Sequence, residues 1–108
     1  MNHDAIYRSH SNVVRIDDAT GAFDADGNQV TIDQSLVDAA AAEISTEKAW
    51  SRLRYDRNQL LTATDWEIVR HKELGTNIPT ALKTYRQELR DLPANTSDPA
   101  NPSWPVKP

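Results

Sequence analysis

Residues 35–61 read SLVDAAAAEISTEKAWSRLRYDRNQLL, a run without Gly or Pro. Ala, Leu, Glu and Arg are frequent in it, and these residues lose little conformational freedom in a helix. Asp33 or Ser35 can cap its start, because a short polar side chain accepts a hydrogen bond from a free backbone N–H. We expect one long helix. The alternative is a break near Ser45 and Thr46, where a second helix would be capped.

The apolar residues of this run lie on two faces rather than one. At about 100° per residue, the two faces are displaced by roughly a third of a turn. The first face consists of Leu36, Val37, Ala40 and Ile44, and the second of Trp50, Leu53, Leu60 and Leu61. A long helix would therefore present each half to a different neighbour.

Upstream, residues 13–32 read as a small β meander. Val13–Ile16 and residues 29–32 are rich in β-branched residues, and Phe23 starts a third short run between them. Asp26-Gly27 predicts a tight hairpin turn, because Gly adopts positive φ without strain. Two or three short strands are marginal alone, so a helix or a neighbour must cover them.

Downstream, Thr64-Asp65-Trp66-Glu67 matches a capping box, which predicts a separate short helix to about Glu73. Gly75 would then cap it in the left-handed conformation. Pro79 suits the first turn of a further helix, over about residues 79–91. The inner face of that helix would be Leu82, Tyr85, Leu89 and Leu92.

The last sixteen residues differ in composition from the rest, since they hold five of the six prolines. The spacings between these prolines are all multiples of three residues. The five prolines are Pro93, Pro99, Pro102, Pro105 and Pro108. Polyproline II has three residues per turn, so all five would share one edge of such a helix. Trp104 is a lone Trp among prolines with no local partner to bury it, and we expect it to anchor the tail in a groove of a partner.

Composition points to a thin core. The chain has 108 residues, of which 38% are hydrophobic and 26% charged, and its mean hydropathy is -0.69. We expect a chain with so few apolar residues to have a thin, helix-rich core or to share its core with a partner. No apolar run is long enough to span a membrane, and the start does not resemble a signal peptide.

Charge changes sign along the chain. Residues 1–47 carry nine acidic and two basic residues, and residues 48–108 carry seven acidic and ten basic residues. Pairing within a solvated surface is one interpretation; head-to-tail association or partner docking is the other. Acids alternate with the later bases and the total is -4, so we expect no nucleic acid partner.

We expect no catalytic, cofactor or metal site. There is no Cys, and His3, His10 and His71 have no second ligand at a metal-binding spacing. The stretch 24–28 resembles a calcium loop only superficially, because Gly27 would place Ala22 at the first ligand position. Three glycines are too dispersed for a phosphate loop. A small hydrolase remains a distant alternative, for which a pocket with His71 near carboxylates would be needed.

Three blocks resemble the phage tail assembly chaperone family. The first is Arg57-Asn58-Gln59-Leu60-Leu61 with Thr64-Asp65-Trp66, the second runs from Tyr85 to Pro93, and the third is Trp104-Pro105-Val106-Lys107-Pro108. The resemblance covers roughly residues 50–108. The chain departs from many members at Leu82, where they carry Trp.

The resemblance implies a non-enzymatic phage protein that binds a tail, baseplate or tail-fibre protein and supports its assembly. It implies a location in the host cytoplasm during assembly, with retention in the virion tail as a further option. A permanent structural subunit of the virion is the alternative function. Homo-oligomers are compatible with either.

The expected fold class is α+β, mainly α, with a β meander over 1–33, a helical domain over 34–92 and an extended tail over 93–108. Arg86 and Arg90 are expected to pair with Asp65, Asp91 or a helix C-terminus, or to dock a partner, and Trp66 to pack between the last two helices. Candidate partner-binding residues are Trp104, Pro99, Pro102, Pro105, Pro108, Trp50, Arg86 and Arg90. Candidate structural residues are Thr64, Asp65, Trp66 and Tyr85.

Overall fold

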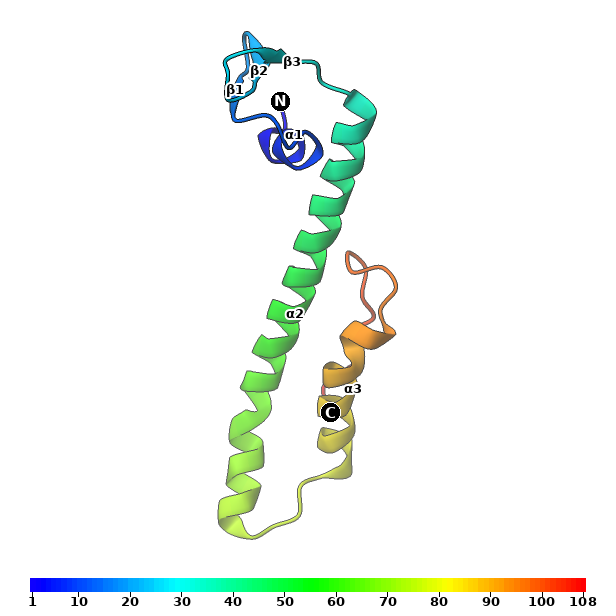
Figure 1. Ribbon diagram of the computed structural model, residues 1–108. Helices are drawn as coiled ribbons and strands as arrows, with labels where there is room; N and C mark the ends of the chain where they lie inside the picture. Colours follow the sequence, from blue (N-terminus) through cyan, green and yellow to red (C-terminus); the bar gives the residue numbers. More distant parts are fainter. The chain divides into compact units, whose positions relative to one another are not determined.

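The computed structural model describes residues 1–108 and confirms a mainly α protein with a small β-sheet. The elements, in order, are α1 (His3–Ser9), β1 (Arg15–Asp17), β2 (Gly21–Phe23), β3 (Gln29–Val30), α2 (Gln34–Leu74) and α3 (Thr80–Asn95) (Figure 1). None of the helices combines the length and apolar character needed to cross a bilayer.

The chain forms two compact units, Met1–Glu47 (unit 1) and Lys48–Pro108 (unit 2), whose boundary falls inside α2. The boundary coincides with the change in charge. Unit 1 holds the nine acidic and two basic residues of the first block, and unit 2 holds the mixed but net basic remainder.

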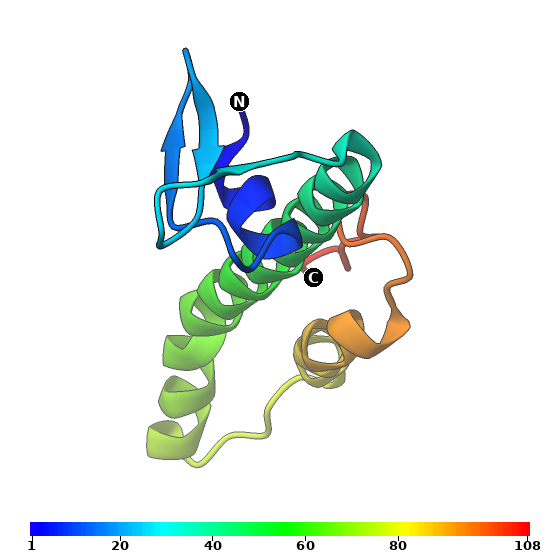
Figure 2. The same ribbon diagram turned by 45° about the horizontal axis from the view of Figure 1, so that its top comes forward.

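In unit 1, the sheet has the order β1-β2-β3 with antiparallel neighbours, as the meander predicted. Gly27 adopts φ +81° in the turn between β2 and β3. Helix α1 packs with the sheet and the first turns of α2 (Figure 2). The buried core consists of Ala5, Ile6, Val13, Ala22, Val37 and Ala40.

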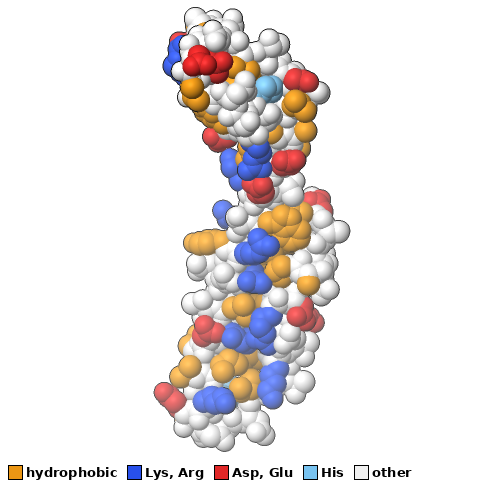
Figure 3. Space-filling model, viewed as in Figure 1, with side chains coloured by type: hydrophobic (Ala, Val, Ile, Leu, Met, Phe, Trp, Pro, Cys, Tyr) orange, Lys and Arg blue, Asp and Glu red, His pale blue; other side chains and the backbone are white.

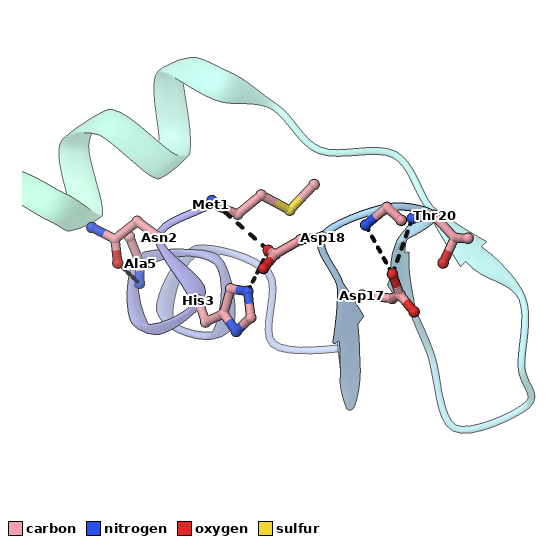
Figure 4. Close-up of polar contacts among 8 residues, drawn as sticks. Met1, Asn2, His3, Ala5, Asp17, Asp18 and Thr20 are labelled. Atoms are coloured by element: carbon pink, nitrogen blue, oxygen red, sulfur yellow. Dashed lines mark hydrogen bonds and ion pairs between the residues drawn. The ribbon is translucent and has the colours of Figure 1, made fainter.

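Helix α1 was not expected from the sequence. The side chain of Asn2 accepts a hydrogen bond from the Ala5 amide and caps the helix. His3 Nε2 lies 2.7 Å from Asp18 Oδ1, and the amino terminus lies 3.8 Å from the same oxygen (Figure 4). These contacts attach α1 to the turn between β1 and β2, and the bond from His3 lowers the pKa of Asp18.

A second polar link joins α1 to α2 within unit 1. The Arg8 guanidinium donates to both carboxylate oxygens of Glu47, at 2.7 and 2.8 Å. This bidentate pair lowers the pKa of Glu47 and raises that of Arg8. The predicted start of α2 is also confirmed, because the Asp33 side chain accepts from the Ser35 amide at 3.0 Å.

Helix α2 has 41 residues and is unbroken, so the alternative of a break near Ser45 is wrong. The predicted separation of its apolar faces is confirmed, because Val37 and Ala40 belong to the core of unit 1. Leu60 and Leu61 pack in that of unit 2. Leu36 departs from its predicted face and is exposed.

The predicted capping box at Thr64 is wrong, because α2 continues through it to Leu74. The Thr64 hydroxyl instead donates to the carbonyls of Leu60 and Leu61 in its own helix. Nothing between Leu61 and Thr64 interrupts the helix, so the polar residues that resemble a cap remain interior positions. Gly75, at φ +69°, ends α2 as predicted.

Unit 2 is an antiparallel pair formed by the later part of α2 and by α3. The predicted inner face of α3 is confirmed: Leu82, Tyr85, Leu89 and Leu92 are all buried. Leu60, Leu61, Ile68 and Ile78 pack against this cluster. Helix α3 starts one residue after Pro79 and ends at Asn95, beyond the predicted end at 91.

Candidate partner-binding surface

The C-terminal tail of the chain lies against the two helices of unit 2. Pro99, Pro102 and Trp104 line a cavity of about 340 Å³ together with residues of α2, among them Leu53. Further along, Lys107 and Pro108 line a second cavity of about 240 Å³ with His71 of α2 and Leu82 of α3. Both cavities lie within unit 2, and Figures 1 and 2 show the C-terminus beside its helices.

The prolines do not share one edge of a continuous polyproline helix, and that prediction is wrong. Pro93 lies in the last turn of α3, and Pro99 lies in a turn closed by a bond from the Asn101 amide to the Asp98 carbonyl at 3.1 Å. Pro99, Pro102 and Pro105 are all half-buried, whereas Pro108 is exposed.

Trp104 has a local partner, contrary to the premise drawn from the sequence. Its side chain lies beside Ala49, Leu53 and Asp56 of α2 and remains 36% exposed. The sequence could not reveal this contact, because the residues involved are about fifty positions apart. A role of Trp104 in binding another chain stays a prediction.

The tail also carries one ion pair. Lys107 Nζ lies 3.9 Å from Glu67 Oε2, an oxygen that is buried and has no hydrogen-bond partner. The amine therefore supplies the compensating charge for a carboxylate that the helix pair partly removes from water. This pair attaches the last residues of the tail to α2.

Arg86 joins the two helices at the centre of unit 2. Its guanidinium donates to the Leu61 carbonyl at 2.8 Å, to the Thr64 hydroxyl at 2.6 Å and to Asp65 Oδ1 at 2.8 Å. The predicted pairing of Arg86 with Asp65 is confirmed. Thr64 is only 1% exposed, so Arg86 also satisfies a hydroxyl that water does not reach.

The remaining predicted residues, Arg90, Trp50 and Tyr85, differ in their surroundings. Arg90 donates to Gln87 of its own helix at 2.9 Å and makes no ion pair with Asp91, so the expected pairing with a carboxylate is not present. Trp50 is half-buried, and the Arg54 guanidinium lies 5.7 Å from the centre of its ring. Tyr85 is buried in the core.

Trp66 does not pack between α2 and α3, and that prediction is wrong. It is 57% exposed. Trp66 comes two residues after the buried Thr64, and at about 100° per residue it therefore lies on nearly the opposite side of α2. Tyr55 and Val69 are exposed on the same outer face of α2. Helical spacing alone could have placed Trp66 there, once the helix was known to be continuous.

A basic groove lies on the side of unit 2 that the tail leaves open. Ile68 of α2 and Lys83, Arg86, Gln87 and Arg90 of α3 line a hollow of about 560 Å³. The tail instead lines a cavity of about 330 Å³ with Glu88 and Asn95, on the other side of the buried face of α3. Figure 3 shows Lys and Arg side chains over apolar ones along unit 2. Lys83 was not predicted from the sequence, although its spacing from Arg86 and Arg90 is helical.

The structure thus places the predicted residues at two separate surfaces of unit 2. Trp104 and the prolines belong to the tail surface, and Arg86 and Arg90 to the basic groove. No group of three or more His, Asp or Glu side chains is arranged to hold a metal ion.

A protein-family model matches the second half of the chain. The family model described as phage tail assembly chaperone protein matches residues 50–108, a little over half of the chain. No curated protein matches. No solved structure matches either.

Proposed function

The chain belongs to the phage tail assembly chaperone family, and from this we propose that it binds a tail, baseplate or tail-fibre protein through unit 2. A role in phage tail assembly follows from the family itself. In the proposed role the chain acts by binding and performs no catalysis. It works in the host cytoplasm while the tail is being built.

One observation supports this proposal above the others. The matched residues, 50–108, fall within the compact unit Lys48–Pro108. What the family shares is therefore one folded unit, and two of its surfaces carry side chains suited to protein contacts. A chaperone needs such a surface to cover a client's apolar segment until the client assembles.

The test is a set of binary binding experiments with the full-length chain. It is co-expressed with each tail, baseplate and fibre protein of its phage, and the complexes are purified. We expect one client to co-purify in a fixed ratio and to become more soluble. If no tail protein binds or gains solubility, the proposal is wrong.

The contribution of the tail surface is tested with Trp104→Ala. We expect weaker client binding, because a partly exposed Trp beside prolines is a favourable anchor. Tyr7→Ser, at an exposed aromatic residue of unit 1, is the matched control. Equal client binding by both variants and the unchanged chain would remove Trp104 from the binding surface.

The alternative function, a permanent virion subunit, requires the same surfaces. Mass spectrometry of purified particles separates the two. A transient chaperone is absent from mature particles, whereas a structural subunit is present in a fixed ratio to the tail proteins.

A further inference from the structure

The basic groove of unit 2 has more positive charge than its surroundings neutralise. Lys83, Arg86 and Arg90 line it from α3. On α2, Arg54 and Lys72 share the side of Leu61 and Ile68, at spacings of seven, seven and four residues along the helix. Lys83, which lines the groove, forms no ion pair, and neither does Lys72.

Only one carboxylate on the groove side of unit 2 forms an ion pair with a basic side chain. Asp65 accepts from Arg86, which also bonds the Leu61 carbonyl and the Thr64 hydroxyl. Arg57, which lies four residues before Leu61 on α2, donates only to the Asn58 side chain, and Arg90 donates only to Gln87. Glu88 of α3 lies on the opposite side of its buried face, and Asp91 accepts a hydrogen bond from Gln87.

Ile68 supplies an apolar side chain to the groove, and Leu61 lies seven residues before it on the same side of α2. Leu61 and Ile68 pack on the core of unit 2 but stay half-buried. Trp50, which is also half-buried, lies on the same side of α2, nearer the N-terminal end of the helix. Two packed helices with an incompletely covered apolar seam present a site for a third helix.

The bases on α2 set the length of the proposed partner helix. Arg54 and Lys72 are eighteen residues apart on α2, which corresponds to about 27 Å at 1.5 Å per residue. A partner helix of about 18 residues has the same length. The tail of the chain itself is not available for this site, because it lies against other residues of the two helices.

We propose that the basic groove binds an amphipathic, acidic helix of the client protein, which completes a three-helix arrangement with α2 and α3. The inference rests on the proposed function and specifies its surface and the chemistry of the partner. Leucine-type side chains of the client cover Leu61 and Ile68. Its carboxylates pair with the bases on both edges, which also steers the encounter.

A nucleic acid fits the groove less well. Phosphates would pair with the bases but leave the apolar side chains of Leu61 and Ile68 uncovered. An amphipathic acidic helix uses both the bases and these apolar side chains.

The test is an amide NMR titration of the full-length protein with a synthetic peptide of about 18 residues. The peptide is built from Glu, Ala and Leu, with Leu at every third or fourth position. We expect saturable shifts at Leu61, Ile68 and Lys83. We also expect binding to weaken at least about tenfold between ~0.05 and ~0.3 M salt. A peptide with Lys in place of Glu should not bind.

Variants locate the site. Arg57→Glu with Arg90→Glu should weaken peptide binding by about tenfold or more. Arg52→Glu with Arg70→Glu introduces the same charge change on other sides of α2 and should weaken it far less. Arg86 is left unchanged, because it joins the two helices.

The inference is wrong if the peptide causes no saturable amide shifts up to about 1 mM, or if the shifts are confined to the outer face of α2 that carries Trp66. It is also wrong if the Lys peptide binds equally well, or if an oligo-dT probe binds more tightly at the same amides. Client binding provides a separate criterion. If a client co-purifies equally with Arg57→Glu/Arg90→Glu and with the unchanged chain, the groove assignment fails while the proposed function stands.

Discussion

Arg86 shows how one side chain sets the geometry of a helix pair. Its guanidinium reaches a carbonyl, a buried hydroxyl and a carboxylate of α2, and its side chain is only 16% exposed. The planar group offers donors in fixed directions, which Lys cannot reproduce. The sequence predicted its pairing with Asp65 but not the bonds to Leu61 and Thr64, because these required α2 to pass through Thr64 without a break.

We therefore expect Arg86→Met to lower the free energy of unfolding by about 2 kcal/mol. The loss comes from the charged hydrogen bonds that Arg86 donates to the Leu61 carbonyl, the buried Thr64 hydroxyl and Asp65. Urea denaturation followed by circular dichroism measures it. Arg90→Met, which removes a bond only to Gln87, is the control and should cost less than about 0.5 kcal/mol. Equal losses in the two variants would contradict this role of Arg86.

Trp66 and Leu53 allow a second test at the residue scale. Leu53 is 2% exposed and Trp66 is 57% exposed. Leu53→Ala should lower the free energy of unfolding by about 2–5 kcal/mol, because it leaves a cavity. Trp66→Gln should change it by less than about 0.5 kcal/mol. Urea denaturation of both variants gives the comparison, and a larger loss for Trp66→Gln would show that Trp66 packs in the core after all.

At the scale of elements, patterns with a single local cause were predictable from the sequence. The periodicity of α3 predicted its buried face, Asp26-Gly27 predicted the hairpin, and Gly75 predicted the end of α2. The Thr64 motif failed because capping residues are compatible with helix interiors when nothing breaks the helix. Helix α1 was missed because seven residues are too few for a periodic signal.

The links of α1 to the rest of unit 1 depend on ionised carboxylates. The pKa of Asp18 is lowered first by its bond to His3, and that of Glu47 by its bond to Arg8. A lowered pKa in the folded state means that the ionised form stabilises the fold. This contribution is present above the ordinary carboxyl range and is lost as the pH falls below about 4.

The matching prediction compares the chain with the double variant Asp18→Asn/Glu47→Gln. The unchanged chain should have the higher melting temperature near neutral pH, and the difference should shrink as the pH falls from about 5 to about 2. Thermal unfolding followed by circular dichroism across this range provides the measurement. A difference that stays constant or grows in acid would show that these carboxylates do not act through their ionised forms.

At the scale of the whole molecule, charge and family membership divide the chain at nearly the same place. The change from a strongly acidic to a net basic segment falls between Glu47 and Lys48. The family match begins two residues later, at Trp50. Unit 2 therefore combines the shared sequence, the basic groove and the tail, and it is the part in which we locate client binding.

The tail is where sequence reasoning was least informative. The proline spacing was visible, but what the prolines contact depends on residues of α2 and α3 far away in the sequence. A composition poor in apolar residues suggested that another chain must hold the tail. In the structure the helices of the same unit do so, and the groove on their other side remains open.

The central claim is that unit 2 holds its own tail and leaves the basic groove for a partner. Nuclear Overhauser effects between the Trp104 indole and the methyl groups of Ala49 and Leu53, measured on the full-length chain, test it most directly. An isotope-filtered experiment on a sample mixed from labelled and unlabelled chains separates contacts within one chain from contacts between chains. The account predicts these effects within single chains only; their absence, or their appearance only between chains, would contradict it.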